Sequence, residues 1–167
     1  MRAVLAACGG FLVGVLWMDL LFDVQALGAP SEAAVASIAL YYRRVTTDAY
    51  PLNRLIVGVM LVTLAVALYR VVRGDSGRVS AAIALLLAAL PIGSAILRVV
   101  PNAVRLGAQT DPLAGQAVLA HAICVDHLLC VASMAAFIAV VLGDRRATPA
   151  PLPACREHLV ARGPTAP

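Results

Sequence analysis

The sequence predicts an all-α integral membrane protein, a four-helix transmembrane bundle with an amphipathic helical segment between spans one and two. Composition is the first observation: hydrophobic residues make up 62% of the 167 residues and charged residues only 13%. Soluble domains are about half apolar and about a quarter charged. The second observation is that the apolar residues form four runs, each able to supply the roughly 20 residues of a membrane-crossing helix. The chain therefore has no room for a separate catalytic domain.

The first apolar run extends from about Ala3 to Leu27 and is interrupted only by Asp19 and Asp23. Its length predicts a membrane span. The two aspartates are four residues apart, so they share one face of the expected helix.

An amphipathic segment follows the first run. Ser31 is a favourable N-cap residue with Glu32 behind it in the first turn, which predicts a helix that ends at about Asp48. Apolar residues recur on one face of this helix, among them Val35 and Ile38. We expect the segment to lie at the membrane surface.

The other three spans are expected at about 55–72, 79–100 and 116–142. Pro91 lies within the third and predicts a kink, which neighbouring helices tolerate. We expect residues 101–115 to form a loop, residues 1–143 to form the transmembrane domain, and the Pro- and Arg-rich residues 144–167 to form a disordered cytoplasmic tail.

Arginine counting predicts the orientation, because positive residues are retained on the cytoplasmic side. The terminal side holds Arg2, Arg70, Arg73, Arg78, Arg145, Arg146, Arg156 and Arg162, and the other side holds Arg43, Arg44, Arg54, Arg98 and Arg105. This bias predicts that both termini are cytoplasmic. All basic residues are arginine, which is typical of a GC-rich bacterial genome and predicts the bacterial inner membrane. Since the arginines flank apolar runs, we do not expect nucleic-acid binding.

The four cysteines contain no C-x-x-C pair, so they predict neither a zinc knuckle nor a thioredoxin-like motif. Cys124 and Cys130 would lie about 9 Å apart along one helix, which is too far for a disulfide. We expect free thiols.

Polar residues inside the apolar runs gather toward the outer end of the predicted bundle. Ionisable residues are costly in hydrocarbon and commonly mark a functional site. The candidate catalytic residues are Asp19, Asp23, Asp126 and His127, and the candidate ligand-binding residues are Trp17, Tyr42, Arg43, Arg44, Arg54, Arg98, Asn102, Arg105 and His121. The simplest pairing places the carboxylates of the first span opposite the guanidinium groups of Arg98 and Arg105, which share a helix face with Asn102 if the helix continues past Pro101.

Three interpretations of these residues remain open. They are structural ion pairs between helices, a metal or haem site, or a pocket for an amphipathic molecule with Asp126 or His127 as the proton-transfer group. The spacing disfavours a metal, because His121 and His127 point about 120° apart around a helix. No metal or other cofactor is predicted.

The order of elements resembles the anthrone oxygenase-like family of small four-span membrane proteins. The resemblance rests on the apolar first helix, on the polar segment from Tyr41-Tyr42-Arg43-Arg44 to Arg54, and on Pro101-Asn102-x-x-Arg105-Leu106 after the third span. Span four departs from the family pattern, because it carries Asp126-His127 in place of a Trp/His/Arg pattern. The resemblance implies cofactor-independent oxygenation of an aromatic substrate.

Two function classes follow from the sequence. One is a small membrane oxidoreductase, or a protein that binds a hydrophobic small molecule. The other is a non-catalytic membrane protein whose polar cluster is structural and which stabilises a membrane partner. The expected partners are the lipid bilayer, a hydrophobic aromatic or quinone-like molecule and, as a further candidate, a second copy of the chain.

Overall fold

The computed structural model describes residues 1–74 and 77–143, which form helices joined by short turns and contain no strand. The predicted tail, 144–167, lies outside the described residues. The helices are α1 (Arg2–Asp23), the 3-10 helix η1 (Val24–Ala26), α2 (Glu32–Thr47), α3 (Leu52–Arg73), α4 (Arg78–Ser94), the π-helix η2 (Ala95–Val99), α5 (Val100–Ala108) and α6 (Leu113–Gly143).

Four helical segments are long and apolar enough to cross a membrane: Arg2–Ala26, Leu52–Arg73, Arg78–Ala108 and Leu113–Gly143. This confirms the four apolar helices predicted from the sequence. Their outer surfaces carry exposed leucine, isoleucine and valine side chains, for example Leu61, Leu86 and Leu129. Such surfaces are typical of helices that face lipid rather than water.

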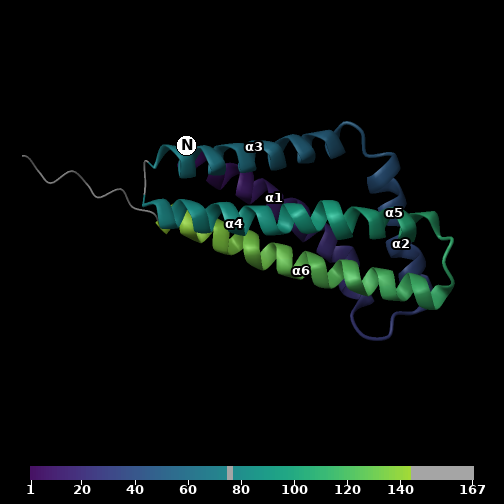
Figure 1. Ribbon diagram of the computed structural model, residues 1–167. Helices are drawn as coiled ribbons and strands as arrows, with labels where there is room; N and C mark the ends of the chain where they lie inside the picture. Colours follow the sequence, from purple (N-terminus) through teal and green to yellow (C-terminus); the bar gives the residue numbers. More distant parts are fainter. Residues whose placement is uncertain (75–76, 144–167) are drawn as a thin grey trace, which may run out of the picture.

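The long helices lie lengthwise beside one another (Figure 1). Helix α6 packs against α1 and α4, and α3 packs against α4 and α1. The start of α1, the end of α3 and the end of α6 lie at one end of the molecule, whereas α2 and α5 lie at the other (Figure 1). Residues far apart in sequence can therefore meet near α2.

The buried apolar residues form two clusters. One lies near α2 and α5 and includes Ile38, Leu106 and Ile123, and the other lies toward the end that carries the N-terminus and includes Leu5, Met134 and Phe137. On α6, Asp126 and His127 come between the residues of the two clusters. A polar layer is thus enclosed between two apolar ones.

Helix α2 begins as predicted, because the Ser31 side chain accepts a hydrogen bond from the Ala34 N–H at 3.2 Å. Its apolar face is buried, with Val35, Ile38 and Ala39 almost inaccessible. Helices α5 and α6 pack against α2. Protein therefore covers the apolar face of this amphipathic helix, and its position at the membrane surface stays a prediction.

Close packing of α2 on α5 depends on Gly107. A Cβ atom at this position would lie 2.9 Å from both the Cα and the backbone nitrogen of Arg43. Only a residue without a side chain allows the two backbones to approach so closely.

The expected loop at 101–115 is shorter than predicted, since α5 occupies most of it. The helix continues from η2 into α5 without a break, so Pro101 does not end it.

Pro91 lies inside α4 and has no N–H to donate to the Leu87 carbonyl. The Ser133 hydroxyl of α6 donates to this carbonyl instead, at 2.8 Å. The helix widens into η2 four residues beyond Pro91. The neighbouring helix thus satisfies the carbonyl that the proline leaves without a donor.

Candidate functional site

Two carboxylates occupy the last two turns of α1. Asp19 and Asp23 lie on the same face, as their spacing predicted, and that face is turned toward α6 and α2. Asp23 is fully buried and Asp19 is partly buried. A buried carboxylate is costly without partners, so what surrounds the two groups determines their role.

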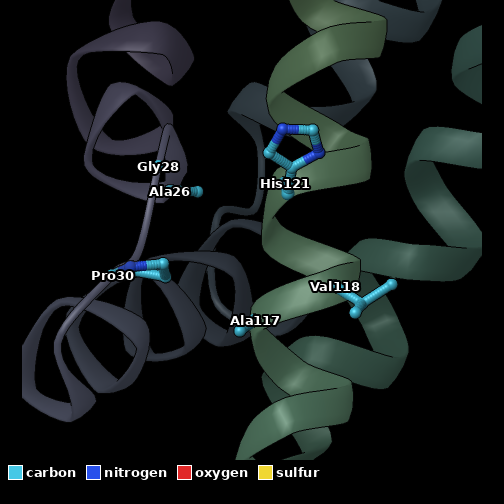
Figure 2. A pocket seen from close by; sticks show the side chains of 6 residues that line it. All are labelled: Ala26, Gly28, Pro30, Ala117, Val118 and His121. Atoms are coloured by element: carbon cyan, nitrogen blue, oxygen red, sulfur yellow. The ribbon is translucent and has the colours of Figure 1, made fainter.

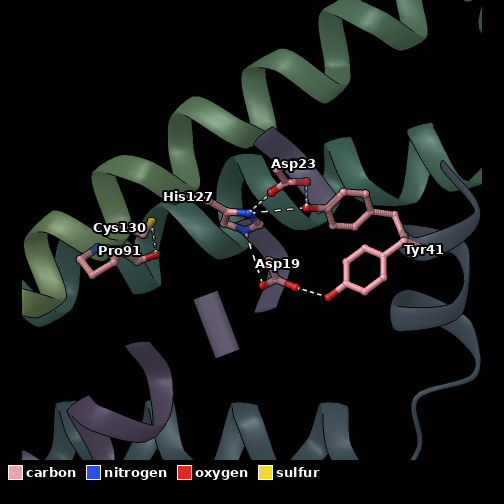
Figure 3. Close-up of polar contacts among 7 residues, drawn as sticks. Asp19, Asp23, Tyr41, Pro91, His127 and Cys130 are labelled. Carbon is pink, nitrogen blue, oxygen red and sulfur yellow. Dashed lines mark hydrogen bonds and ion pairs between the residues drawn. The ribbon is translucent and has the colours of Figure 1, made fainter. Parts of the chain in front are cut away.

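His127 of α6 lies between the two carboxylates (Figure 3). Its Nδ1 is 2.6 Å from Asp23 Oδ2 and its Nε2 is 3.9 Å from Asp19 Oδ2. The shorter distance suits an Nδ1–H that donates to the Asp23 carboxylate. A carboxylate in this position orients the imidazole ring. The histidine and the two aspartates therefore form a site that can hold a proton.

Two tyrosines of α2 complete the network. The Tyr42 hydroxyl donates to Asp23 Oδ1 at 2.7 Å and lies 3.5 Å from His127 Nδ1. The Tyr41 hydroxyl donates to Asp19 Oδ1 at 2.5 Å, and its ring stacks on Phe22 with centroids 4.1 Å apart. Burial and the neighbouring carboxylates raise the pKa of both tyrosines. Both phenols therefore remain hydrogen-bond donors at neutral pH.

Asp126 belongs to a different pair. The Arg98 Nε lies 3.1 Å from Asp126 Oδ2, although the contact lacks the geometry of a hydrogen bond, and within the described residues this oxygen accepts none. Arg105 pairs with Asp111 at 3.1 Å. The expected pairing of Asp19 and Asp23 with Arg98 and Arg105 is therefore wrong. The histidine and the tyrosines occupy both α1 carboxylates, and each arginine has an acidic partner nearer to it.

The other sequence candidates lie away from the histidine. Arg43 and Arg44 are exposed on α2, and the Arg54 guanidinium lies 4.8 Å from the centroid of the Tyr50 ring. Trp17 is 61% exposed, so it does not line the buried site. Asn102 lies between Arg98 and Arg105 in the chain. The helix continues past Pro101, which was the condition for these three residues to share a face.

His121 does not join His127. It borders a separate small hollow of about 250 Å³ with Ala26, Gly28, Pro30, Ala117 and Val118 (Figure 2). Within residues 1–74 and 77–143, no group of three or more His, Cys, Asp or Glu side chains is placed to hold a metal ion. Cys8, Cys124 and Cys130 are free thiols, which confirms the expectation for these three, and Cys155 lies outside the described residues.

A larger hollow, of about 610 Å³, lies next to the histidine site. Tyr41, Arg44, Val45, Asp48 and Ala49 line it. It is a shallow depression, widely open to the surroundings. Tyr41 connects the hollow to the site, because the same side chain borders the hollow and donates to Asp19. The sequence indicated Tyr41 only as part of the segment Tyr41-Tyr42-Arg43-Arg44. No pattern signalled its hydrogen bond, which depends on how α2 packs on α1.

Comparison with known proteins finds no match for this chain among family models, curated proteins or solved structures.

Proposed function

We propose that this is a bacterial inner-membrane protein that binds an amphipathic, hydrophobic small molecule beside α2, with His127 and its two aspartates as a proton acceptor. The observation that carries the proposal is the chain of contacts from the hollow through Tyr41 to Asp19 and on to His127. If a hydroxyl group of a bound molecule reaches Asp19, two contacts connect it to the buried Asp23: Asp19 to His127, and His127 to Asp23. The four apolar helices support the membrane location.

The lining of the hollow favours a ligand with both apolar and polar parts. Val45, Ala49 and the Tyr41 ring provide apolar surface, while Arg44 and Asp48 provide one charge of each sign. A quinol or another hydroxylated aromatic molecule matches this combination. Carboxylate and imidazole groups in a buried site are suited to general acid–base work near neutral pH. The finer proposal, from the family resemblance, is that such a molecule reacts with O2 without a cofactor after its hydroxyl has lost a proton to the site. One oxygen atom would replace the two hydrogens of a ring CH2 group to form C=O, and the other would leave with them as water.

Binding of a defined probe tests the proposal. The protein is purified, reconstituted into lipid nanodiscs and titrated with a quinol that carries a decyl chain, with heat release measured in two buffers of different ionisation enthalpy. We expect saturable binding with a proton transferred to the protein, and an affinity at least tenfold lower in Tyr41→Phe and His127→Gln. Tyr69→Phe is the matched control, because Tyr69 lies near the end of α3 that is farther from α2 and from the histidine site.

A second function is supported by the burial of the histidine site. Asp23 and His127 are buried and paired with each other, and the larger hollow reaches neither of them directly. In this alternative the network holds α1, α2 and α6 together, and the protein stabilises a membrane partner without catalysis. Failure of the quinol and of other hydroxylated aromatics to bind, together with a large loss of thermal stability in His127→Gln, would favour this alternative.

A further inference from the structure

A second charged pair lies outside the histidine site and faces the outer surface. Arg98 belongs to η2, and its side chain is 64% exposed, whereas the Asp126 carboxylate beneath it is 4% exposed. The Arg98 Nε lies 3.1 Å from this carboxylate, and most of the arginine side chain is open to its surroundings. Among the described residues, Asp126 is the one acidic partner within ion-pair distance of Arg98.

The surroundings of Arg98 are apolar and exposed. Its neighbours along the helix are Leu97, which is 77% exposed, and Ile96 and Val100, which are also exposed. In the proposed membrane location these side chains face lipid. A guanidinium among them is stable when an anion and water are within reach.

Position along the helix places Arg98 near the edge of the hydrocarbon layer. It lies twenty residues after Arg78, the first residue of the same apolar segment. At 1.5 Å per residue this is about 30 Å, the thickness of the hydrocarbon core. When Arg78 lies at one boundary of the hydrocarbon core, Arg98 therefore lies at the other boundary, from which a long side chain can extend toward the lipid phosphates.

Further polar residues continue outward from Arg98. Asn102 and Arg105 follow it by four and seven residues, a spacing that places them on one helical face. Arg105 is exposed beside Asp111. A lipid headgroup with its phosphate at Arg98 would thus have hydrogen-bonding partners one and two turns farther out.

We propose that Arg98, oriented by Asp126, binds the phosphate of a phospholipid headgroup at the outer boundary of the membrane. Arginine is suited to this role because its planar fork matches phosphate oxygens two at a time. Asp126 is a positioning residue that keeps the guanidinium nearby through the ion pair. The inference rests on the proposed membrane location but not on ligand binding at His127.

Native mass spectrometry of the detergent-purified protein tests the inference, with dioleoyl phosphatidylglycerol as the probe. Arg98→Gln alone leaves Asp126 buried without a cation, so the principal variant is Arg98→Gln with Asp126→Asn. We expect this variant to bind the lipid at least fivefold more weakly than the parent, and Arg98→Lys to be intermediate. Arg54→Gln, which removes an exposed arginine from α3, should bind like the parent.

Two results of this experiment would overturn the inference. Equal lipid binding by the parent and the double variant overturns the inference. Loss of bound lipid on addition of millimolar inorganic phosphate would show a site for soluble anions and would also overturn it. Membrane insertion is measured separately by fractionation, so absence from the membrane fraction would refute the proposed location, whereas insertion with unchanged lipid binding refutes the lipid site alone.

Discussion

Asp23 Oδ2 lies 2.6 Å from His127 Nδ1, although 104 residues separate the two in sequence. The contact joins the end of α1 to the middle of α6 (Figure 3). It is the centre of the polar layer between the two apolar clusters. The first prediction therefore concerns its loss.

Asp23→Ala should lower the free energy of unfolding by about 3 to 5 kcal/mol, because it leaves His127 and the Tyr42 hydroxyl buried without their acceptor. Asp111→Ala is the control, since its pair with Arg105 is partly exposed and such a pair at a surface is worth at most about 1 kcal/mol. Thermal unfolding in detergent measures both. Equal effects of the two substitutions would show that water reaches Asp23.

Stability should fall above pH 10 because the folded state resists ionisation of Tyr41 and Tyr42. The pKa of each is raised by burial and by the adjacent carboxylates, while in the unfolded chain tyrosine ionises near its usual value of about 10. The folded protein then binds more protons than the unfolded one, so stability is complete below pH 10 and decreases above it. Melting temperatures from pH 8 to 11 should decline less steeply in Tyr42→Phe than in the parent.

Gly107→Ala should separate α2 from α5, because its Cβ would meet the Arg43 backbone at 2.9 Å. Overpacking of this kind costs about 1 to 3 kcal/mol. Gly58→Ala provides the matched control, since a Cβ there meets no atom within 4 Å and alanine favours helix by up to about 1 kcal/mol. Opposite shifts in melting temperature are expected, and a stabilising Gly107→Ala would contradict the close packing of the two helices.

Ser133→Ala should leave the Leu87 carbonyl without a donor, because Pro91 supplies no N–H to it. A buried polar group that loses its partner costs about 1 to 3 kcal/mol. Ser80→Ala, in the first turn of α4, is the control. If Ser133→Ala unfolds at the same temperature as the parent, the carbonyl must have another donor.

The proposed orientation in the membrane predicts the sites of accessible reporters. A reporter fused after Gly143 should be active in the cytoplasm, and one inserted between Gln109 and Pro112 should be active outside, because arginines are retained on the inner side. The structure places the N-terminus and the end of α6 at the same end of the molecule, as this topology requires. Reversed activities would move the histidine site to the cytoplasmic side.

The sequence alone determined the helical class, the four apolar segments and the start of α2. Each of these depends on local properties, namely the length of an apolar run and the capping side chain of Ser31, so no distant contact is needed to predict them. It also identified Asp19, Asp23, Asp126 and His127 as unusual, since a charged residue in an apolar run is anomalous wherever the chain folds.

Only the tertiary structure decided how these residues pair. The rotation of each helix about its axis sets which side chains meet, and the apolar residues of α1 and α6 surround most of each helix, so their pattern leaves that rotation undefined. Packing on α6 turned Asp23 toward His127 rather than toward an arginine, and packing of α2 on α5 at Gly107 brought Tyr41 and Tyr42 to the carboxylates. The pairing is a property of the interfaces, because the energy of a buried charge depends on the few atoms around it.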